Sequence, residues 1–381
     1  MVRALPDPIR GLQDRSRLIA NPCFGASESY PARLMQCGAH AHHRPDCQSR
    51  LARDIRRIIA NASNLQIADR VNIVMRVLTA AHSLGVERVL VMPDNGGIRA
   101  LLQRHLSRGH SQHQKWPVVE YLDMEPTSTV EDTFQAARLM HAAGVAAIVV
   151  LGGDGTHRAV VRECRSIPIA GLSTGTNNAF PEMRESTITG MAVALYATGR
   201  LSAAQALAPN KLLDVSINEG AQRDIALVDA VISTDRYIGA RALWKPEALS
   251  AAYLTFADPQ AIGLSAIGGL LQPVGRRDPG GLAVQLGHHP QPAALRLLAP
   301  IAPGMVRPVA IAHWQAMPAD QPFAVLQQGG VVALDGEREL AFDAGDRVQI
   351  TLRENAFPTV DVARCMQIAA CEGLLRLPST P

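Results

Sequence analysis

The chain has 381 residues, of which 47% are hydrophobic and only 4% are aromatic, and its formal net charge is +3 at pH 7. This length is sufficient for two domains, and the composition is that of a globular protein with an aliphatic core. A charge so close to neutral gives no indication of a nucleic-acid partner or of a membrane surface. No apolar run approaches the roughly 18 residues that a membrane-spanning helix needs.

The cysteines and the N-terminal residues indicate a reducing compartment. The six cysteines are scattered and form no Cys-x-x-Cys pair, as in proteins that are kept reduced in the cytoplasm. Residues 1–16 contain arginines but also Asp7 and Asp14, and they lack the apolar stretch of a secretory signal. We therefore expect a cytoplasmic protein.

The first half of the chain predicts strands that alternate with helices. The expected helices have apolar residues at three- and four-residue spacing, and the expected strands are short apolar runs. The predicted strands are residues 16–22, 88–94 and 146–153 and the first part of residues 167–178. The predicted helices are residues 52–62, 68–85 and 130–144 and a helix whose first residues are 156–164. Gly85 and Gly144 are positioned to end two of these helices. Because the strands lack period-2 alternation, the pattern indicates βαβ units whose parallel sheet is covered on both faces.

The pattern changes after about residue 209. Short segments with partial alternation follow, separated by Gly, Pro and Asp, and they predict an antiparallel β-sandwich. These segments are residues 211–218, 224–233, 281–286, 305–314, 323–336 and 346–354. Residues 361–377 return to helical spacing and are expected to pack on the first domain. The predicted organisation is an α/β domain at 1–205, a β-sandwich domain at 206–360, and a C-terminal helix or tail at 361–381.

A glycine-rich stretch, GGDGT at residues 152–156, directly follows the apolar run 146–151. A strand, a bare turn and a helix start form a phosphate site, because glycine lets the backbone approach an anion and the first helical amides point at it. Asp154 does not suit a passive phosphate cradle, since its carboxylate repels phosphate. It suits a site where it contacts a metal or accepts a proton from a hydroxyl. The alternative is a tight strand-to-helix turn with Asp154 as its N-cap.

A second polar loop, GLSTGTNNAFP at residues 171–181, begins with the next predicted strand. Its hydroxyl and amide side chains belong to Thr174, Thr176, Asn177 and Asn178. Loops after neighbouring parallel strands lie side by side, and ligands bind in the crevice between them. A third stretch, VVALDGERE at residues 331–339, ends a β segment with Asp335 and Glu337. Alone, this stretch is typical of an Asp-Gly turn with solvated charges.

Together these motifs resemble the superfamily of NAD kinases and diacylglycerol/sphingosine kinases. Most of the chain is similar to one NAD-kinase-like group of that superfamily, the acetoin-catabolism X proteins. The stretches that carry the resemblance are LIANP, DIRRIIANAS, VNIVMRVL, VVLGGDGTHRAVV, LSTGTNNAFP, IALVDAVISTDRYIGARALW, ADPQAIGLSAIGG and LDGERE, within residues 16–25 and 53–360. The resemblance implies a Rossmann-like N-terminal domain with a parallel sheet, a β-rich, sandwich-like C-terminal domain, and a nucleotide cleft between them.

The resemblance also implies roles for single residues. In the superfamily the GGDGT loop faces the nucleotide phosphates, and its aspartate, here Asp154, is a candidate base or metal-contacting group. Glu337 matches the glutamate that is implicated as the base in lipid kinases, so both carboxylates are candidate catalytic residues. The expected nucleotide-binding residues are Gly152, Gly153, Gly155, Thr156, Thr174, Gly175, Thr176, Asn177, Asn178, Asp229 and Asp335.

Two motifs depart from the NAD-kinase pattern. The second loop matches the lipid-kinase pattern Gly-Thr-x-Asn-x-Phe through residues 175–180, whereas NAD kinases end this motif in Leu-Gly-Phe. The NAD-kinase stretch Ala-Leu-Asn-Glu, which holds the dinucleotide, is Ala-Leu-Val-Asp here, at residues 226–229. Because Val228 replaces the asparagine, the acceptor specificity of NAD kinases does not transfer directly to this chain.

The sequence thus predicts an ATP-dependent small-molecule kinase that phosphorylates a hydroxyl of NAD or of a related metabolite, with the link to acetoin catabolism implied by the resemblance. Glycine amides would hold the donor phosphates and Mg²⁺ would bridge them. ATP and polyphosphate both stay open as donors, but the absence of a Lys-bearing Walker A motif excludes the P-loop route. The alternatives are a lipid kinase for diacylglycerol or sphingoid bases, and a non-catalytic nucleotide-binding protein. Since kinases of this superfamily commonly self-associate, a homo-oligomer is also expected.

One segment is expected to be an insertion. Family members run from Asn-Pro-x-x-Gly almost directly to Asp-Ile-Arg-Arg, whereas here NPCFG ends at Gly25 and DIRR begins at Asp54. Residues 26–52 are therefore predicted to form a mobile surface loop beside the phosphate crevice. They contain Cys37, His40, His42, His43 and Cys47. These are metal ligands by type, but they match no standard zinc spacing, and we expect no metal site.

Overall fold

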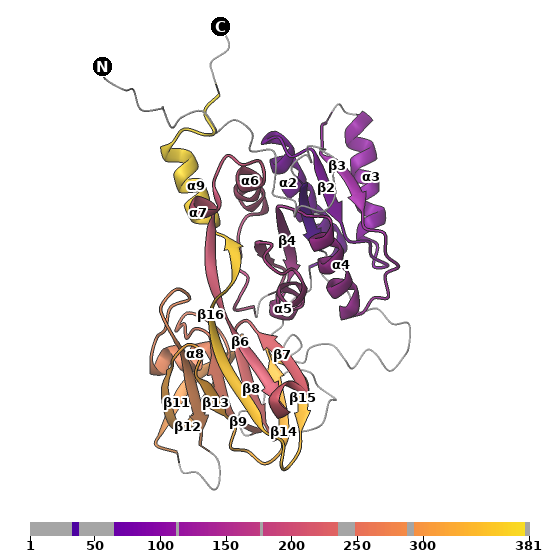
Figure 1. Cartoon of the computed structure of the whole chain (residues 1–381). Helices are drawn as coiled ribbons and strands as arrows, with labels where there is room; N and C mark the ends of the chain where they lie inside the picture. Colours follow the sequence, from indigo (N-terminus) through magenta and orange to yellow (C-terminus); the bar gives the residue numbers. More distant parts are fainter. Residues whose placement is uncertain are drawn as a thin grey trace, which may run out of the picture.

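A computed structural model describes residues 33–37, 65–111, 114–175, 178–234, 248–287 and 293–377. Figure 1 shows an α/β lobe and a β-rich lobe, with the long strands β6 (Leu207–Ile217) and β16 (Val348–Val360) passing from one to the other. The predicted fold class is confirmed, since a parallel sheet with helices is followed along the chain by a β-rich lobe.

The α/β lobe is built on parallel strands in the order β3-β2-β1-β4-β5. These strands are β1 (Arg33–Cys37), β2 (Arg88–Val91), β3 (Val118–Tyr121), β4 (Ala147–Gly152) and β5 (Ile169–Ser173). The helices are α2 (Ile67–Ser83), α3 (Ile98–Ser111), α4 (Val130–Ala142), α5 (Asp154–Glu163), α6 (Ser186–Ala197) and α7 (Ala203–Ala206). Helices α2 and α4 end as predicted, before Gly85 at φ +89° and Gly144 at φ +62°.

Both faces of the parallel sheet are covered by helices. Val149 and Leu151 of β4 pack in one core with α2, α3 and α6, whereas Ile148 and Val150 pack in a second core with α4 and α5. Every residue of β4 is buried. A strand with two buried faces needs an apolar residue at each position, which explains why its sequence shows no alternation.

The β-rich lobe contains an antiparallel sheet in the order β11-β12-β10-β9-β8-β14-β15. Its strands are β8 (Asp229–Ser233), β9 (Leu249–Leu254), β10 (Gly281–Leu286), β11 (Leu295–Ala302), β12 (Met305–Met317), β14 (Gly330–Leu334) and β15 (Glu337–Phe342). This sheet packs on β6, β16, β7 (Gln222–Ala226) and β13 (Pro322–Ala324), which extend the first sheet. Helix α8 (Leu264–Leu271) packs on the other face. The short helix η2 (Asn218–Gly220) connects β6 to β7.

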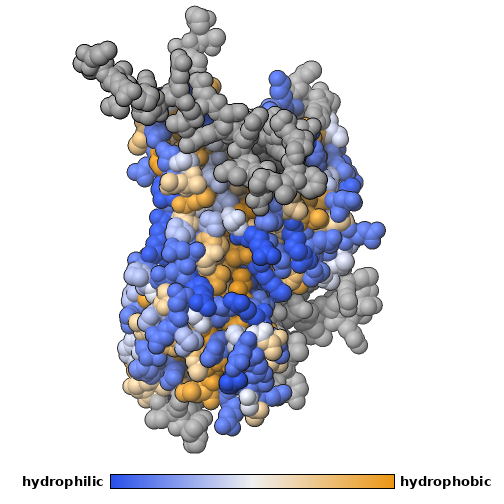
Figure 2. Space-filling view, in the orientation of Figure 1, coloured by the Kyte–Doolittle hydropathy of each residue, from blue (hydrophilic) through white to orange (hydrophobic). Residues whose placement is uncertain are grey.

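The two lobes share one sheet. Strand β16 pairs antiparallel with β6, and close to its end it pairs in parallel with β5, through Thr359 and Ile169. Helix α9 (Val362–Cys371) then packs on α6 and α7 of the first lobe, with Val362 and Cys365 in that core. The face in Figure 2 shows apolar residues gathered along its middle, where the long strands run between the lobes in Figure 1. The first lobe is therefore completed by the C-terminal strand and helix.

The surface loop that we predicted at residues 26–52 is wrong for Arg33–Cys37, which form β1 inside the parallel sheet. Leu34 pairs with Val89 of β2 on one side and with Ala147 of β4 on the other. The prediction failed because motif spacing carries no information about which segment fills the gap between two parallel strands. The rest of this segment lies outside the described residues, with His40, His42, His43 and Cys47, and so do the strand and helix expected at 16–22 and 52–62.

Other expectations need smaller corrections. The single segment expected at 224–233 is two strands, β7 and β8, with a break at Leu227 and Val228. Helices α3, α6 and α8 and strands β3, β9, β11 and β15 were not singled out from the sequence. Within the described part of the chain, no helix combines the length and apolar character that crossing a membrane requires.

Candidate functional site

The GGDGT turn and the second polar loop meet at the carboxyl edge of the parallel sheet. Strand β4 ends at Gly152 and β5 ends at Ser173, and these two residues pair with each other. The backbone amide of Thr174 donates to the carbonyl of Gly152 over 3.4 Å. The prediction that the two loops lie side by side is confirmed, at the edge where α/β sheets bind ligands.

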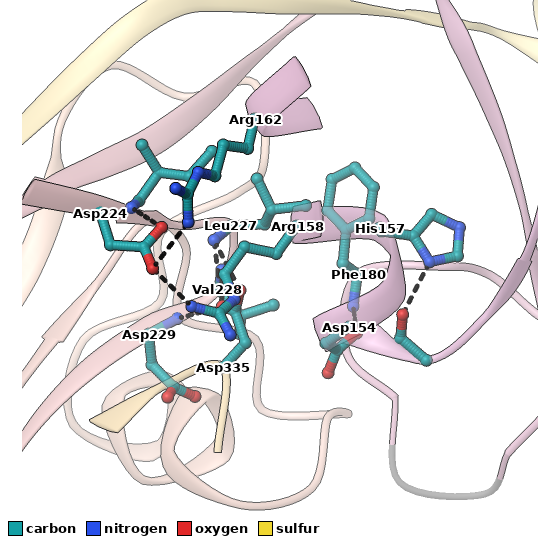
Figure 3. A network of polar contacts seen from close by, with 12 residues as sticks. Asp154, His157, Arg158, Arg162, Phe180, Asp224, Leu227, Val228, Asp229 and Asp335 are labelled. Carbon is teal, nitrogen blue, oxygen red and sulfur yellow. Dashed lines mark hydrogen bonds and ion pairs between the residues drawn. The ribbon is translucent and has the colours of Figure 1, made fainter. Parts of the chain in front are cut away.

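Asp154 links the two loops. It is the first residue of α5 and Gly153 is the N-cap, so the alternative in which Asp154 caps the helix is wrong. Its Oδ1 accepts hydrogen bonds from the amides of Phe180 at 2.8 Å and Ala179 at 3.2 Å, and its Oδ2 accepts from Ala179 at 3.0 Å. Figure 3 shows the carboxylate beside Phe180. Charged acceptors make the stronger hydrogen bonds, so Asp154 holds the second loop against the start of α5.

The glycines of the turn allow close packing between the loops. A Cβ on Gly152 would lie 2.5 Å from Cβ of Thr156, and a Cβ on Gly153 would lie 2.7 Å from Oδ1 of Asn178. At both positions a Cβ would force its neighbour to shift, so glycine is what permits the observed packing. The N-cap residue, Gly153, has no side chain of its own to accept the first helical amides. The start of α5 therefore keeps the character of an anion site.

Asn178 and Ser173 order the second loop. Nδ2 of Asn178 donates to Oγ of Ser173 over 2.9 Å, and Oγ of Ser173 donates to the carbonyl of Gly175 over 3.0 Å. Thr176 and Asn177, which were expected to bind the nucleotide, lie outside the described residues. The described part of the loop is thus fixed by contacts to its own strand and to the GGDGT turn.

His157 lies fully buried under the turn and was not found from the sequence. Its Nδ1 donates to the carbonyl of Gly153 over 2.8 Å, and its ring centre lies 5.7 Å from that of Phe180. Burial lowers the pKa of His157 to about 4, so its imidazole is uncharged at neutral pH. No motif or periodicity marks a single histidine of this kind, and only the packing reveals it.

Arg276, from the second lobe, was also missed. Its Nη1 donates to the carbonyl of Phe180 over 2.9 Å, and its Nη2 donates to the carbonyl of Ala179. Its guanidinium carbon lies 4.3 Å from the ring centre of Phe256. Burial lowers the pKa of Arg276, and the charges of Glu182 and Asp154 oppose this change. Arginine stays protonated in proteins, so a positive charge lies next to the second loop.

Asp335, which was expected to contact the nucleotide, is buried instead (Figure 3). Its Oδ1 accepts from the amides of Leu227 at 3.0 Å, Val228 at 2.8 Å and Asp229 at 3.3 Å. Burial raises the pKa of Asp335 to about 7, and Arg158 opposes this rise. In this structure the carboxylate has no exposed surface and accepts the backbone amides between β7 and β8, so its role as a nucleotide-binding residue stays a prediction.

An ionic network joins α5 to the second lobe (Figure 3). Nη1 of Arg158 lies 3.4 Å from Oδ2 of Asp224, and its Nε lies 3.8 Å from Oδ2 of Asp335. Nη1 of Arg162 lies 3.5 Å from the same Asp224 oxygen. The side chains of Arg158 and Asp335 are only 9% and 0% exposed. The helix that begins in the GGDGT turn is thus anchored to strands of the other lobe.

Asp229 and Glu337, two further residues expected at the site, each begin a strand of the second lobe. Asp229 begins β8 and is 8% exposed. Glu337 begins β15, but its side chain lies outside the described part of the structure. Of the two candidate catalytic carboxylates, only Asp154 can therefore be placed. The described residues contain no group of three or more His, Cys, Asp or Glu side chains that could hold a metal ion.

A curated relative decides the family. The chain is 61% identical over 328 residues to Acetoin catabolism protein X of Cupriavidus necator (strain H16), and the alignment covers 85% of this chain and 91% of that protein. The chain belongs to the acetoin catabolism protein X family. Residues 211–355 match the model of the acetoin catabolism protein X C-terminal domain, and residues 57–201 match that of the ATP-NAD kinase N-terminal domain. The NAD-kinase-like resemblance predicted from the motifs is confirmed.

The fold was also compared with solved structures. A candidate diacylglycerol kinase from Bacillus anthracis str. Sterne aligns with a TM-score of 0.39 and 12% sequence identity, over 72% of this chain and 96% of that chain.

Proposed function

We propose that this chain is a phosphotransferase of the NAD-kinase-like type, which binds ATP where the GGDGT turn (152–156) meets the second loop (171–181). The observation that carries the proposal is the interlock of these loops through Asp154, at the carboxyl ends of β4 and β5. This edge is where open α/β sheets bind ligands, and a helix start favours phosphate. The match of residues 57–201 to the ATP-NAD kinase model supports the same position.

The residues of the junction suit a triphosphate with Mg²⁺. Gly153 and Gly155 leave the backbone bare at the start of α5, and Thr156, Thr174 and Asn178 add hydroxyl and amide groups. The described residues form no preformed metal cluster. This agrees with Mg²⁺ that arrives on the phosphates, since that ion keeps several waters and needs only one or two carboxylates. When bound, Mg²⁺ would neutralise the charge that develops during phosphoryl transfer.

The contacts favour different roles for the two candidate carboxylates. Both oxygens of Asp154 accept backbone hydrogen bonds, so we assign it to positioning of the second loop. Glu337 is then the candidate base that takes the proton of the acceptor hydroxyl. We assign Asp335 and Asp229 to the connection between the lobes, where the carboxylate of Asp335 accepts the amide of Asp229.

The acceptor is proposed to be a hydroxyl of NAD or of a related metabolite. The amides of Leu227, Val228 and Asp229 are occupied by Asp335. These backbone amides are therefore engaged, and Val228 offers no side-chain amide in place of the asparagine that holds the dinucleotide in NAD kinases, so the proposal includes an acceptor other than NAD. The name of the Cupriavidus relative leads us to propose a role in acetoin catabolism. We further propose that the protein acts in the cytoplasm as a homo-oligomer.

A non-catalytic nucleotide-binding protein is the second candidate. It is favoured by one observation, namely that both oxygens of the Asp154 carboxylate accept backbone amides. A carboxylate engaged in this way is a weaker proton acceptor than a free one. In this alternative the same loops bind the phosphates, but no group completes the transfer.

A transfer assay separates these functions. The protein is incubated with Mg²⁺ and γ-labelled ATP, or with polyphosphate, against NAD, NADH, diacylglycerol and sphingoid bases. Label on NAD or NADH supports the proposal, and label on a lipid establishes the lipid-kinase alternative. Saturable ATP binding without transfer to any acceptor favours the non-catalytic protein. If the protein does not bind ATP, the assignment of the junction is wrong.

A further inference from the structure

We infer that the turn at residues 275–280 of the second lobe is a latch that sets the conformation of the second loop, and that Arg276 is its positioning residue. Its effect on nucleotide affinity rests on the proposed function, but its effect on the loop does not.

Arg276 holds the second loop from the side opposite to Asp154. The guanidinium donates to the carbonyls of Ala179 and Phe180, whereas Asp154 accepts from the amides of the same two residues. The peptide group between Ala179 and Phe180 is thus held at both ends, by one charged group from each lobe. The planar guanidinium suits this task, because it presents several donors in a fixed geometry.

Aromatic rings fix the position of the guanidinium. Its carbon lies 4.3 Å from the ring centre of Phe256 and 5.8 Å from that of Phe180. A cation over an aromatic face is attracted to the ring, and burial strengthens this attraction. Arg276 is therefore held in place from the second lobe by Phe256 while it contacts the first lobe.

Lys211 holds the turn that carries Arg276. Its Nζ donates to the carbonyls of Gly275 at 3.0 Å, Asp278 at 2.9 Å and Gly280 at 2.8 Å. An ammonium has three donors, so these carbonyls use all of them. Lys211 is 7% exposed and lies on β6, the strand that passes between the lobes. The amide of Gly275 also donates to Oδ2 of Asp278 over 2.8 Å.

These contacts form a continuous connection between the lobes. It runs from Lys211 through the turn to Arg276, and from there through the second loop to Asp154 at the start of α5. Movement of the second lobe away from the first would break the contacts of Arg276, because in this connection its guanidinium joins the turn to the loop. The second lobe thereby controls the order of the loop that we propose binds phosphate.

Arg277 provides a matched control. It is the next residue of the same turn and has the same charge, but it pairs with Asp361 and its side chain is 66% exposed. The compared variants are Arg276→Met and Arg277→Met, which each remove one guanidinium and keep an apolar side chain. Hydrogen exchange is measured for the backbone amides of residues 173–182 and, as an internal reference, for strands β9 and β14.

Exchange within residues 173–182 is expected to be about tenfold faster in Arg276→Met, because two hydrogen bonds to a charged donor are lost. In Arg277→Met it is expected to match the wild type, and β9 and β14 should be unchanged in both variants. Arg276→Lys should restore part of the protection, since Lys211 shows that an ammonium can bind carbonyls in this fold. The affinity for Mg·ATP should fall by about tenfold in Arg276→Met alone.

Lys211→Met tests the same connection from its other end. This variant should also speed exchange in residues 173–182, and combining it with Arg276→Met should add little, because residues in one network are not additive. The latch is refuted if Arg276→Met leaves exchange in the loop unchanged, or if it accelerates exchange equally in β9 and β14. If the wild type does not bind Mg·ATP, the proposed function fails, while the exchange result still decides the latch.

Discussion

Asp154→Asn distinguishes a positioning residue from a catalytic base. Oδ1 of Asp154 accepts from Phe180 at 2.8 Å, and Oδ2 accepts from Ala179 at 3.0 Å. Asparagine can keep one of these acceptors, but its NH₂ group must then face the amide of the other residue. A hydrogen bond to a charged group contributes about 1.5–3 kcal/mol, so we expect the free energy of unfolding to fall by about 2 kcal/mol.

The assay combines urea unfolding with Mg·ATP titration. If Asp154 positions the loop, its substitution by Asn should weaken Mg·ATP binding and lower stability together. Asp346→Asn is a suitable control, because Asp346 also accepts a backbone amide, from Asp343 over 2.7 Å, but lies before β16 in the second lobe. The control should leave the affinity unchanged. The reasoning is refuted if Asp154→Asn keeps both stability and affinity while turnover falls by about 10²–10⁴, the contribution of a general base.

Three further predictions concern the groups around the site. His157 has a pKa of about 4 in the folded protein, below the usual histidine value of 6.5, so its contribution to stability is complete above pH 6.5 and is lost as the pH falls towards 4. The loss corresponds to about 3 kcal/mol. Urea unfolding from pH 4 to 7 should show it in the wild type relative to His157→Asn, and equal pH profiles of the two proteins would contradict the prediction. Gly152→Ala places a Cβ 2.5 Å from that of Thr156, and we expect the free energy of unfolding to fall by about 1–3 kcal/mol from overpacking. No loss in the same assay would count against the close packing of Gly152 on Thr156 within the turn. Asp335→Ala leaves the buried amides of Leu227 and Val228 without their acceptor and removes one of the carboxylates that face Arg158, which should cost about 3–5 kcal/mol. Asp320→Ala removes an exposed ion pair with Arg353 and should cost less than about 1 kcal/mol. Similar losses in the two variants would show that the buried network contributes little to stability.

Local sequence patterns were sufficient to predict the central strands of the first lobe. These strands are buried on both faces of the sheet and are therefore continuous apolar runs. Strands β2, β4 and β5 and helices α2, α4 and α5 lie where periodicity and glycine stops placed them. The adjacency of the two loops also followed from sequence, because parallel strands bring their carboxyl ends to one edge.

Long-range contacts could not be predicted in the same way. Arg276 lies far along the chain from Ala179 and Phe180, which it contacts, and no motif marks it. The burial of Asp335 was not predicted, because an Asp-Gly turn does not reveal whether its carboxylate faces solvent or a set of backbone amides. The position of β1 in the sheet was missed for a related reason, since strand pairing depends on tertiary structure rather than on local sequence.

The central claim is that the start of α5 binds the phosphates of a nucleotide, and Gly155 tests it most directly. Gly155 lies in the first turn of α5, where an acidic residue is favourable for the helix but opposes a bound phosphate. Gly155→Asn is the uncharged, nearly isosteric control for Gly155→Asp, and the Mg·ATP affinity of both is measured by calorimetry. We expect the Asp variant to bind at least about tenfold more weakly than the Asn variant, with equal or higher stability. Equal affinities in two folded variants would contradict the phosphate site.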